Sequence, residues 1–240
     1  MRNVALPWFA AFVVVVALAA RPSPAQSGDF TVSQNGHAVG TASFQFTATA
    51  GGYDSSSLVK VTMQRLDYSL SKTEQLDQAN HLKHVVLSGL VNGSAVNVTG
   101  KPDAAQFLLN ISANGRSTTT PLEGHSGAVF LPDFDPGALE TLLALAVQQN
   151  NRDLWAIIPR QAGSVEPVQL ATYPDEQGTL DGKPVAVHHM VATIAGTQTD
   201  LFSGPENQLL QAELPQAGFA LVRKGFVLTP PKKPIAPPEP

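Results

Sequence analysis

The sequence predicts a mainly β protein: a single long antiparallel meander, curled into an incompletely closed barrel, with one amphipathic helix on its concave face. Three Asn-Gly pairs, beginning at Asn35, Asn92 and Asn114, each separate two strand-like runs. Asn-Gly is a strong signal for a two-residue hairpin, and short strands at regular spacing indicate an antiparallel sheet or barrel. After the N-terminus, only residues 136–149 carry a strong helical pattern. A long meander exposes fewer pairing edges when it curls or closes, so we expect curvature.

Alternating or apolar runs mark the expected strands. From Phe30 onward, polar and apolar residues alternate, and Phe44 and Phe46 share one face of the second run. The expected strands are 30–34, 38–48, 58–63, 66–70, 85–91, 95–99, 107–112, 116–120, 128–131, 154–158, 165–173, 185–194, 199–202, 208–214 and 219–226. Residues 174–178 and 181–184 are expected to be turns, because they combine Pro, Asp and Gly. Residues 74–81 fit either the loop end of a hairpin or one short helical turn.

The predicted helix has a start, an apolar face and an end. Asp135 is a suitable N-cap, and Pro136 suits the first helical position, where no N–H is needed. Leu139, Leu142, Leu143 and Ala146 then recur at helical spacing and form one apolar face, while Glu140, Thr141 and Gln148 share the opposite side. Asn150-Asn151 marks the end of the helix. A lone apolar helix must bury this face, and strands are its available partner.

The two ends of the chain differ in composition from the rest. Residues 1–25 resemble a secretory signal peptide, with Arg2, an apolar run over 4–20 and small residues before a predicted cleavage after Ala25. The alternative is a retained membrane anchor, but the run is short for a span and contains Pro7. Residues 26–229 contain no long linker and are expected to form a single domain, followed by a Pro-rich disordered tail over 230–240. We therefore expect a periplasmic or secreted protein without a transmembrane span after cleavage.

The composition narrows the classes of partner. The formal net charge is −4, and removal of Arg2 and Arg21 with the signal peptide brings it to −6. Nucleic acid is not an expected partner, because phosphate binding requires clustered Lys and Arg. The chain has no cysteine, so it forms no disulfide and carries no lipid-modified cysteine. No glycine-rich phosphate loop or dinucleotide fingerprint occurs, and no cofactor is expected.

The histidines give little support for a metal site. His81 and His84 would share a face on a helix but point to opposite faces on a strand, and no third ligand lies at a supporting interval. His188 and His189 are adjacent on an expected strand, so one is expected at the surface and the other packed. No metal site is predicted.

Motifs for nucleophilic catalysis are incomplete. Gly124-His125-Ser126-Gly127 resembles part of a nucleophile elbow, but Ala128 stands where the second glycine of that motif belongs. Ser57 to Lys60 matches the Ser-x-x-Lys form within an expected strand rather than at a helix N-terminus. A serine hydrolase is therefore the weakest functional hypothesis.

Two further groups of residues have alternative explanations. Asp133 and Asp135 could act as paired carboxylates in acid–base catalysis. Helix capping by Asp135, with Asp133 beside the positive end of the helix, explains them better. Asn92, Asn97 and Asn110 lie in glycosylation sequons, which matter only in a host that glycosylates exported proteins.

The C-terminal third resembles exported bacterial envelope proteins. The resemblance is carried by residues 173–182, 185–194, 200–202 and 207–213 and by the hairpins that these residues imply. This part of the chain is similar to periplasmic domains in which a long antiparallel sheet curls about a helix, as in the carrier and receptor of the lipoprotein-sorting system. The resemblance implies a concave apolar face that could hold an acyl chain or a hydrophobic peptide. It lies in pattern rather than in a diagnostic motif, and it transfers no functional residue.

The first functional hypothesis is therefore a non-catalytic binding protein of the envelope with a lipid-like or hydrophobic ligand. The residues expected to line the ligand site are all apolar, and their alternative role is ordinary core: Phe44, Phe46, Phe130, Leu139, Leu142, Leu143 and Trp155. The second hypothesis is a structural or assembly protein that binds another envelope protein through its sheet edges or its C-terminal tail.

Overall fold

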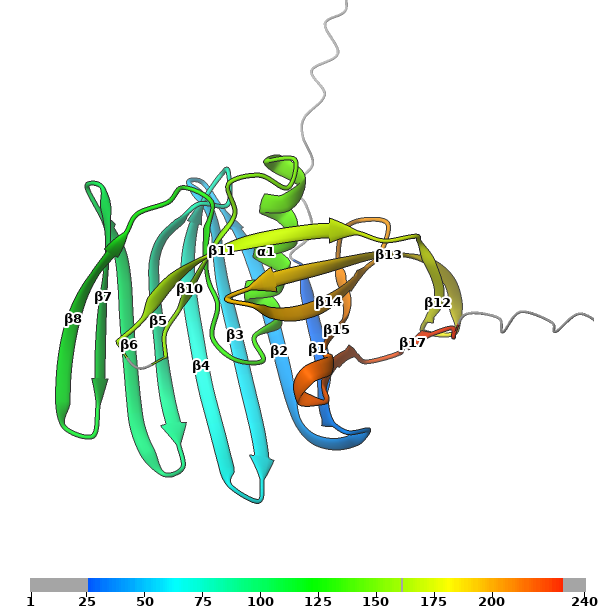
Figure 1. Ribbon diagram of the computed structural model, residues 1–240, viewed down its shortest axis with the longest axis horizontal. Helices are drawn as coiled ribbons and strands as arrows, with labels where there is room; N and C mark the ends of the chain where they lie inside the picture. Colours follow the sequence, from blue (N-terminus) through cyan, green and yellow to red (C-terminus); the bar gives the residue numbers. More distant parts are fainter. Residues whose placement is uncertain (1–25, 161, 231–240) are drawn as a thin grey trace, which may run out of the picture.

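The computed structural model describes residues 26–160 and 162–230. The protein is mainly β, with 66% strand and 8% helix, which confirms the predicted fold class. One large sheet curls without closing into a barrel, and α1 lies against it (Figure 1). The predicted signal peptide (1–25) lies outside the described residues, as does the predicted tail beyond Pro230. No helix in the described ranges is long and apolar enough to cross a membrane.

The first half of the chain is a meander of long strands. Its elements are β1 (Ser27–Gln34), β2 (His37–Thr49), β3 (Gly52–Met63), β4 (Leu66–Asp77), β5 (Leu82–Val91), β6 (Ser94–Asp103), β7 (Gln106–Ala113), β8 (Arg116–Glu123) and the short β9 (Ala128–Phe130). The three Asn-Gly pairs form the predicted hairpin turns, and each pair has positive φ at both residues.

The second half begins with the helix. Its elements are α1 (Pro136–Gln148), β10 (Trp155–Ile158), β11 (Ser164–Thr172), β12 (Glu176–Leu180), β13 (Lys183–Ile194), β14 (Thr197–Ser203), β15 (Leu209–Leu214), the 3-10 turn η1 (Pro215–Ala217), β16 (Phe219–Arg223) and β17 (Phe226–Leu228).

The two halves of the sheet join at its first strand. β1 pairs with β2 on one side and with β16 on the other, both antiparallel. From this junction, one branch runs through β2 to β8, and the other runs back through β15, β14 and β13 to β11. The second branch crosses in front of the first in Figure 1, with α1 beside the crossing. The curled sheet therefore forms the concave side predicted for the helix.

One strand pair departs from the antiparallel pattern. β9 and β10 are parallel, with Val129 opposite Ala156. The chain leaves β9, passes through α1 and returns to the edge of β9, which is the long connection that parallel neighbours require. Hairpin signals reveal only pairs that are adjacent in sequence, so this pair was not predicted.

Three local assignments are now corrected or resolved. The turn predicted over 174–178 is only partly correct, because β12 begins at Glu176 and pairs with both β13 and β17. The strand predicted over 219–226 is interrupted by a turn at Lys224-Gly225, where Gly225 has φ +82°. The ambiguous segment 74–81 is the end of β4 and a turn, in which the Asp77 carboxylate accepts hydrogen bonds from the N–H groups of Ala79 and His81.

The helix is buried on more sides than its pattern indicates. Leu142 and Leu143 are each 1% exposed and belong to the main hydrophobic core, as predicted. Glu140 and Thr141, on the supposed polar side, are also buried. β15 covers that side, and the backbone N–H of Leu209 donates a hydrogen bond of 2.8 Å to Glu140 Oε1. The helix is thus enclosed by the curled sheet rather than laid on its surface.

Candidate functional site

An apolar groove lies on the concave side, between the entry to α1 and the second branch of the sheet. The loop that leads into the helix forms one wall, and Leu139 lies at the floor. The end of β10 and strands β13 to β16 form the remaining walls. The groove has a volume of about 210 Å³. Its apolar lining residues are Leu131, Pro132, Phe134, Leu139, Ile158, Ile194, Ala195, Ala212, Leu214, Phe219, Ala220 and Leu221.

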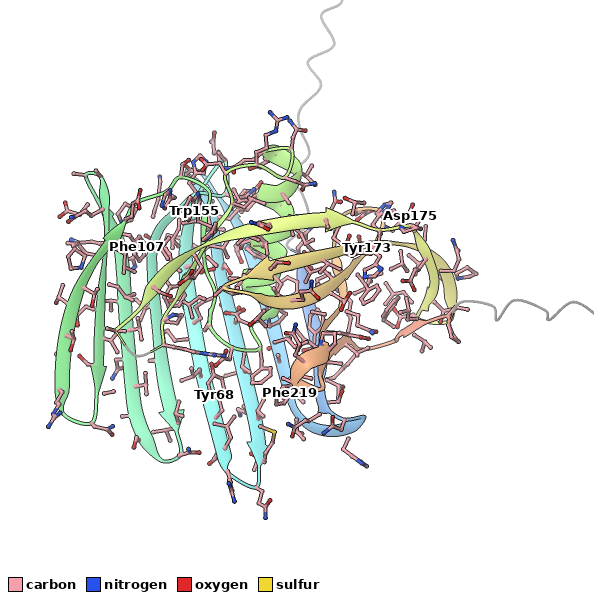
Figure 2. All side chains as sticks on the ribbon, in the orientation of Figure 1. Tyr68, Phe107, Trp155, Tyr173, Asp175 and Phe219 are labelled. Atoms are coloured by element: carbon pink, nitrogen blue, oxygen red, sulfur yellow. The ribbon has the colours of Figure 1, made fainter. Side chains whose placement is uncertain are left out.

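An aromatic cluster borders this groove: Phe134 and Phe219 line it, and Tyr68 packs against Phe134. Phe134 contacts Tyr68 and Phe219 edge to face, at centroid distances of 6.2 and 4.9 Å. Tyr68 comes from the first branch of the sheet and Phe219 from the second, as Figure 2 shows. Because Phe134 contacts both rings, it bridges the two branches. The hydroxyl of Tyr68 donates a hydrogen bond of 3.3 Å to the Asp133 carbonyl, and its burial raises the pKa of that hydroxyl. This contact holds the loop before the helix against β4.

The backbone at Phe134 is unusual. Its φ is +58°, in the left-handed region that non-glycine residues seldom occupy. The conformation turns the chain from β9 into the helix and directs the phenyl ring to the groove. Such strained positions persist only where surrounding contacts stabilise them, and they cluster at binding and switch regions. The two ring contacts of Phe134 supply that stabilisation.

A single ion pair stands at the mouth of the groove. Arg160, which follows β10, donates to both carboxylate oxygens of Asp133, with Nε at 3.2 Å from Oδ2. The hydrogen bond and charge of Asp133 raise the pKa of Arg160. The Arg160 side chain is 71% exposed, so the pair adds little stability. It ties the loop before the helix to the end of β10, and with Asp135, Thr197 and Thr199 it supplies the polar part of the lining.

A buried charge cluster supports the groove from beneath. Lys72 Nζ lies 2.9 Å from Glu74 Oε2 and 2.8 Å from Asp135 Oδ2, and all three side chains are at most 2% exposed. The other oxygen of Asp135 accepts hydrogen bonds from the N–H groups of Gly137 and Ala138, which confirms the predicted N-cap. The cluster therefore attaches the start of the helix to β4.

The titration of this cluster follows from its burial. Burial alone lowers the pKa of Lys72, but the charges of Asp135 and Glu74 outweigh it and raise that pKa. For Glu74, burial and the neighbouring Asp135 raise the pKa, and Lys72 only partly opposes them. One cation cannot neutralise two buried carboxylates. Lys72 therefore stays charged, while the cluster favours a proton on Glu74.

The structure places the residues predicted to line a ligand in different parts of the protein. Leu139 lines the groove. Phe44, Phe130, Leu142 and Leu143 are buried in the main core, and Phe46 packs against its edge. Trp155 is stacked on His125 at a ring-centroid distance of 3.6 Å, away from the groove. A role for any of them in ligand binding stays a prediction.

Sequence reasoning missed the residues that frame the groove. Tyr68, Lys72 and Glu74 alternate on the inward face of β4, but the predicted strand ended at residue 70. A charged pair at inward positions of an alternating run was the available signal. Phe134, Arg160 and Phe219 come from three separate segments that only the tertiary structure brings together. Asp133, which was predicted beside the positive end of the helix, also forms an ion pair with Arg160 that was not predicted.

The nucleophile-like segment lies apart from the groove. His125 and Ser126 line a separate hollow of about 250 Å³ together with His81. His125 Nε2 lies 3.7 Å from Glu123, and its ring is held by Trp155.

His188 and His189 pair with carboxylates. One of this adjacent pair was expected at the surface and the other packed, and the side chains of His188 and His189 are 42% and 15% exposed. His189 lies between Glu176 and Asp200, at 3.2 and 2.9 Å. Among the described residues, no group of three or more His, Cys, Asp and Glu side chains could hold a metal ion.

A larger hollow, of about 620 Å³, lies near the start of β1 but has a different character. Half-buried Ser43 of β2 and the exposed Ser56 and Ser71 of β3 and β4 line it. Arg223, Lys224 and Phe44, one of the residues predicted to line a ligand, also belong to its lining. Its lining is mostly polar, so it suits an apolar ligand less well than the smaller groove. Apolar lining with a few polar groups is the usual character of a small-molecule site.

Comparison with protein-family models, curated proteins and solved structures gives no match for this chain.

Proposed function

We propose that this protein is an exported, non-catalytic binding protein of the cell envelope that holds an apolar ligand in the groove beside the start of α1. The observation that supports the proposal is the groove itself: a mostly apolar lining on the concave side, one ion pair at its mouth and an aromatic cluster at its border. The proposed export rests on the predicted signal peptide.

The size of the groove limits the ligand. Pockets for drug-sized molecules usually measure about 300–1,000 Å³, and this groove has about 210 Å³. The fit is therefore to one narrow apolar group, such as part of a single acyl chain or one apolar side chain of a peptide. A bulky or multiply charged ligand would leave polar groups unpaired against the apolar wall.

The proposal is tested by filling the groove from its wall. Thr199, on β14, lines the groove and is half-buried, so Thr199→Trp should place an indole in the ligand volume. We expect this variant to bind the fluorescent fatty acid cis-parinaric acid at least about tenfold more weakly, because the acyl chain of the probe loses most of its buried area. Probe fluorescence gives the affinity, and native mass spectrometry checks for co-purified lipid.

The neighbouring residue supplies the matched control. Gln198 is exposed and points to the opposite face of the same strand, so Gln198→Trp adds the same side chain outside the groove. The control should bind the probe as the unmodified protein does. Equal affinity of all three proteins, each with an unchanged thermal midpoint, would place the binding elsewhere. Absence of any probe or fatty-acid binding by the unmodified protein would remove the proposal.

A further inference from the structure

The buried charge cluster of Lys72, Glu74 and Asp135 holds an amine against a carboxyl group. Lys72 Nζ lies 2.8 Å from Asp135 Oδ2, and the carboxyl carbon Cγ is one bond beyond that oxygen. Two groups that react must be held at near-contact distance, about 3–3.5 Å between the reacting atoms. Lys72 belongs to β4 and Asp135 precedes α1, so the fold brings together two segments that are far apart in the chain.

The surrounding sheet keeps bulk water from this amine and carboxyl group. The side chains of Lys72, Glu74 and Asp135 are at most 2% exposed. On the neighbouring strands, Ser57 of β3 and Leu87 of β5 lie opposite Lys72, and both are buried. A dry site favours an amide over an ion pair, because a neutral amide is less costly to bury and water is excluded from the reverse reaction.

The second oxygen of the Asp135 carboxyl group is held by hydrogen-bond donors. The backbone N–H groups of Gly137 and Ala138 donate to Oδ1, at 2.9 and 3.1 Å. Two such donors at the positive end of a helix stabilise negative charge on that oxygen, as the donors of an oxyanion hole do. Helix capping explains the contacts of Oδ1 but not the buried amine beside Oδ2. One carboxyl group therefore has a nucleophile on one side and an oxyanion site on the other.

Glu74 supplies a group that can transfer protons to and from the amine. Its Oε2 lies 2.9 Å from Lys72 Nζ. Burial and the neighbouring Asp135 raise the pKa of Glu74, which favours a proton on it in the resting cluster. A carboxyl group that contacts a reacting nitrogen can accept a proton on one oxygen and donate one from the other. A simple ion pair needs only one carboxylate, whereas a condensation also needs such a relay.

We propose that Lys72 and Asp135 condense to form an intramolecular isopeptide bond, with Glu74 as the proton relay. The ion-paired cluster is the reactant state. Lys72 first passes a proton to Asp135 Oδ2, which gives a neutral amine beside a neutral carboxyl group. Nζ then attacks Cγ, and Oδ1 takes the negative charge. Glu74 accepts a proton from the nitrogen and returns one to Oδ2, which leaves as water.

The atoms of this reaction balance without a further reactant. The Nζ–Cγ bond forms and the Cγ–Oδ2 bond breaks. Two of the three ammonium protons of Lys72 leave with Oδ2 as water, the third stays on the amide nitrogen, and Glu74 ends with the proton that it had. Because Lys72 is charged in the resting cluster, the neutral amine is a minor state. We therefore expect one slow turnover per molecule, over hours, after the chain has folded.

Mass spectrometry of the intact chain tests this proposal. The measured mass should fall below the mass calculated from the residues by about 18 Da, the mass of one water, and the fraction of shifted chain should grow during incubation. Trypsin should leave the bond after Lys72 uncut and release a branched peptide that joins Lys72 to Asp135. A chain that keeps its full mass after several days of incubation, or a shifted chain without this branched peptide, would overturn the proposal.

Substitutions separate this reaction from other losses of water. Lys72→Arg keeps a cation but has no amine nucleophile, so it should retain its full mass, whereas Lys60→Arg, at an exposed position, should lose water as the unmodified chain does. Glu74→Gln should slow the loss at least about tenfold, because an amide cannot relay protons. Asp181-Gly182 can also lose water by closing to a succinimide ring. A loss that Lys72→Arg retains, or one that Glu74→Gln leaves equally fast, would contradict the proposed reaction.

Discussion

Replacing Lys72 with methionine is expected to lower the free energy of unfolding by about 3–5 kcal/mol at pH 8. Within residues 26–160 and 162–230, Lys72 is the only cation that contacts the two buried carboxylates of Glu74 and Asp135. Without it, these groups must remain charged and unpaired or take up protons, and either change costs stability. Asp135 also caps α1, so we expect the start of the helix and the adjoining groove to loosen. Urea unfolding gives the change in free energy.

The control for this prediction lies on the neighbouring strand. Lys60, on β3, is exposed, and Lys60→Met should change stability by no more than about 0.5 kcal/mol. Probe binding by Lys72→Met should weaken as well, because the cluster positions the loop that carries Phe134. A Lys72→Met protein as stable as Lys60→Met would show that the buried cation is not required for the fold.

The second large effect concerns pH. Burial raises the pKa of Glu140 from 4.5 to about 7, although the hydrogen bond from Leu209 and the charge of Arg223 oppose the shift. The folded protein therefore retains a proton on Glu140 at pH values where the unfolded chain has lost it. Stability from this group is complete below pH 4.5 and is lost as pH rises through 7. A shift of this size corresponds to about 3 kcal/mol.

Glu140→Gln should remove this dependence. Glutamine still offers an oxygen to the N–H of Leu209 but does not ionise. We expect the variant to match the unmodified protein near pH 4.5 and to exceed its stability by about 3 kcal/mol at pH 8. Urea unfolding across this pH range measures the difference, in which contributions from other titrating groups cancel. Glu206→Gln, at an exposed position, should follow the unmodified curve. If the free energy of unfolding changed with pH in the same way for all three proteins, the raised pKa of Glu140 would be contradicted.

Local sequence patterns were sufficient for the hairpins and the helix. Asn-Gly favours positive φ at two successive residues, and this geometry pairs the flanking strands whatever lies elsewhere in the chain. Asp135 and Pro136 likewise define a helix start through bonds within a single turn. The same reasoning failed at β12, where pairing on both sides overrides the turn signal of Pro174, Asp175 and Gly178.

The groove could not be predicted in the same way. Its walls come from the loop after β9, the helix, the end of β10 and strands β13 to β16. These segments meet because β1 joins the two branches of the sheet. They also meet because the chain passes through α1 between β9 and β10, which pair in parallel. Neither pairing produces a local pattern in the sequence. Phe134, Phe219 and Arg160 therefore looked like ordinary loop and strand residues until the fold placed them together.

By itself, the sequence determined that this protein is a curled, mainly antiparallel sheet with one buried helix, because alternation, turn chemistry and capping act over a few residues. Only the tertiary structure decided that Lys72, Glu74 and Asp135 share one buried site and that Glu140 faces β15 rather than water. It also decided which apolar residues line a groove and which fill the core. The physical reason is that burial and charge pairing depend on distance in space, and residues far apart in the chain meet only when the sheet curls.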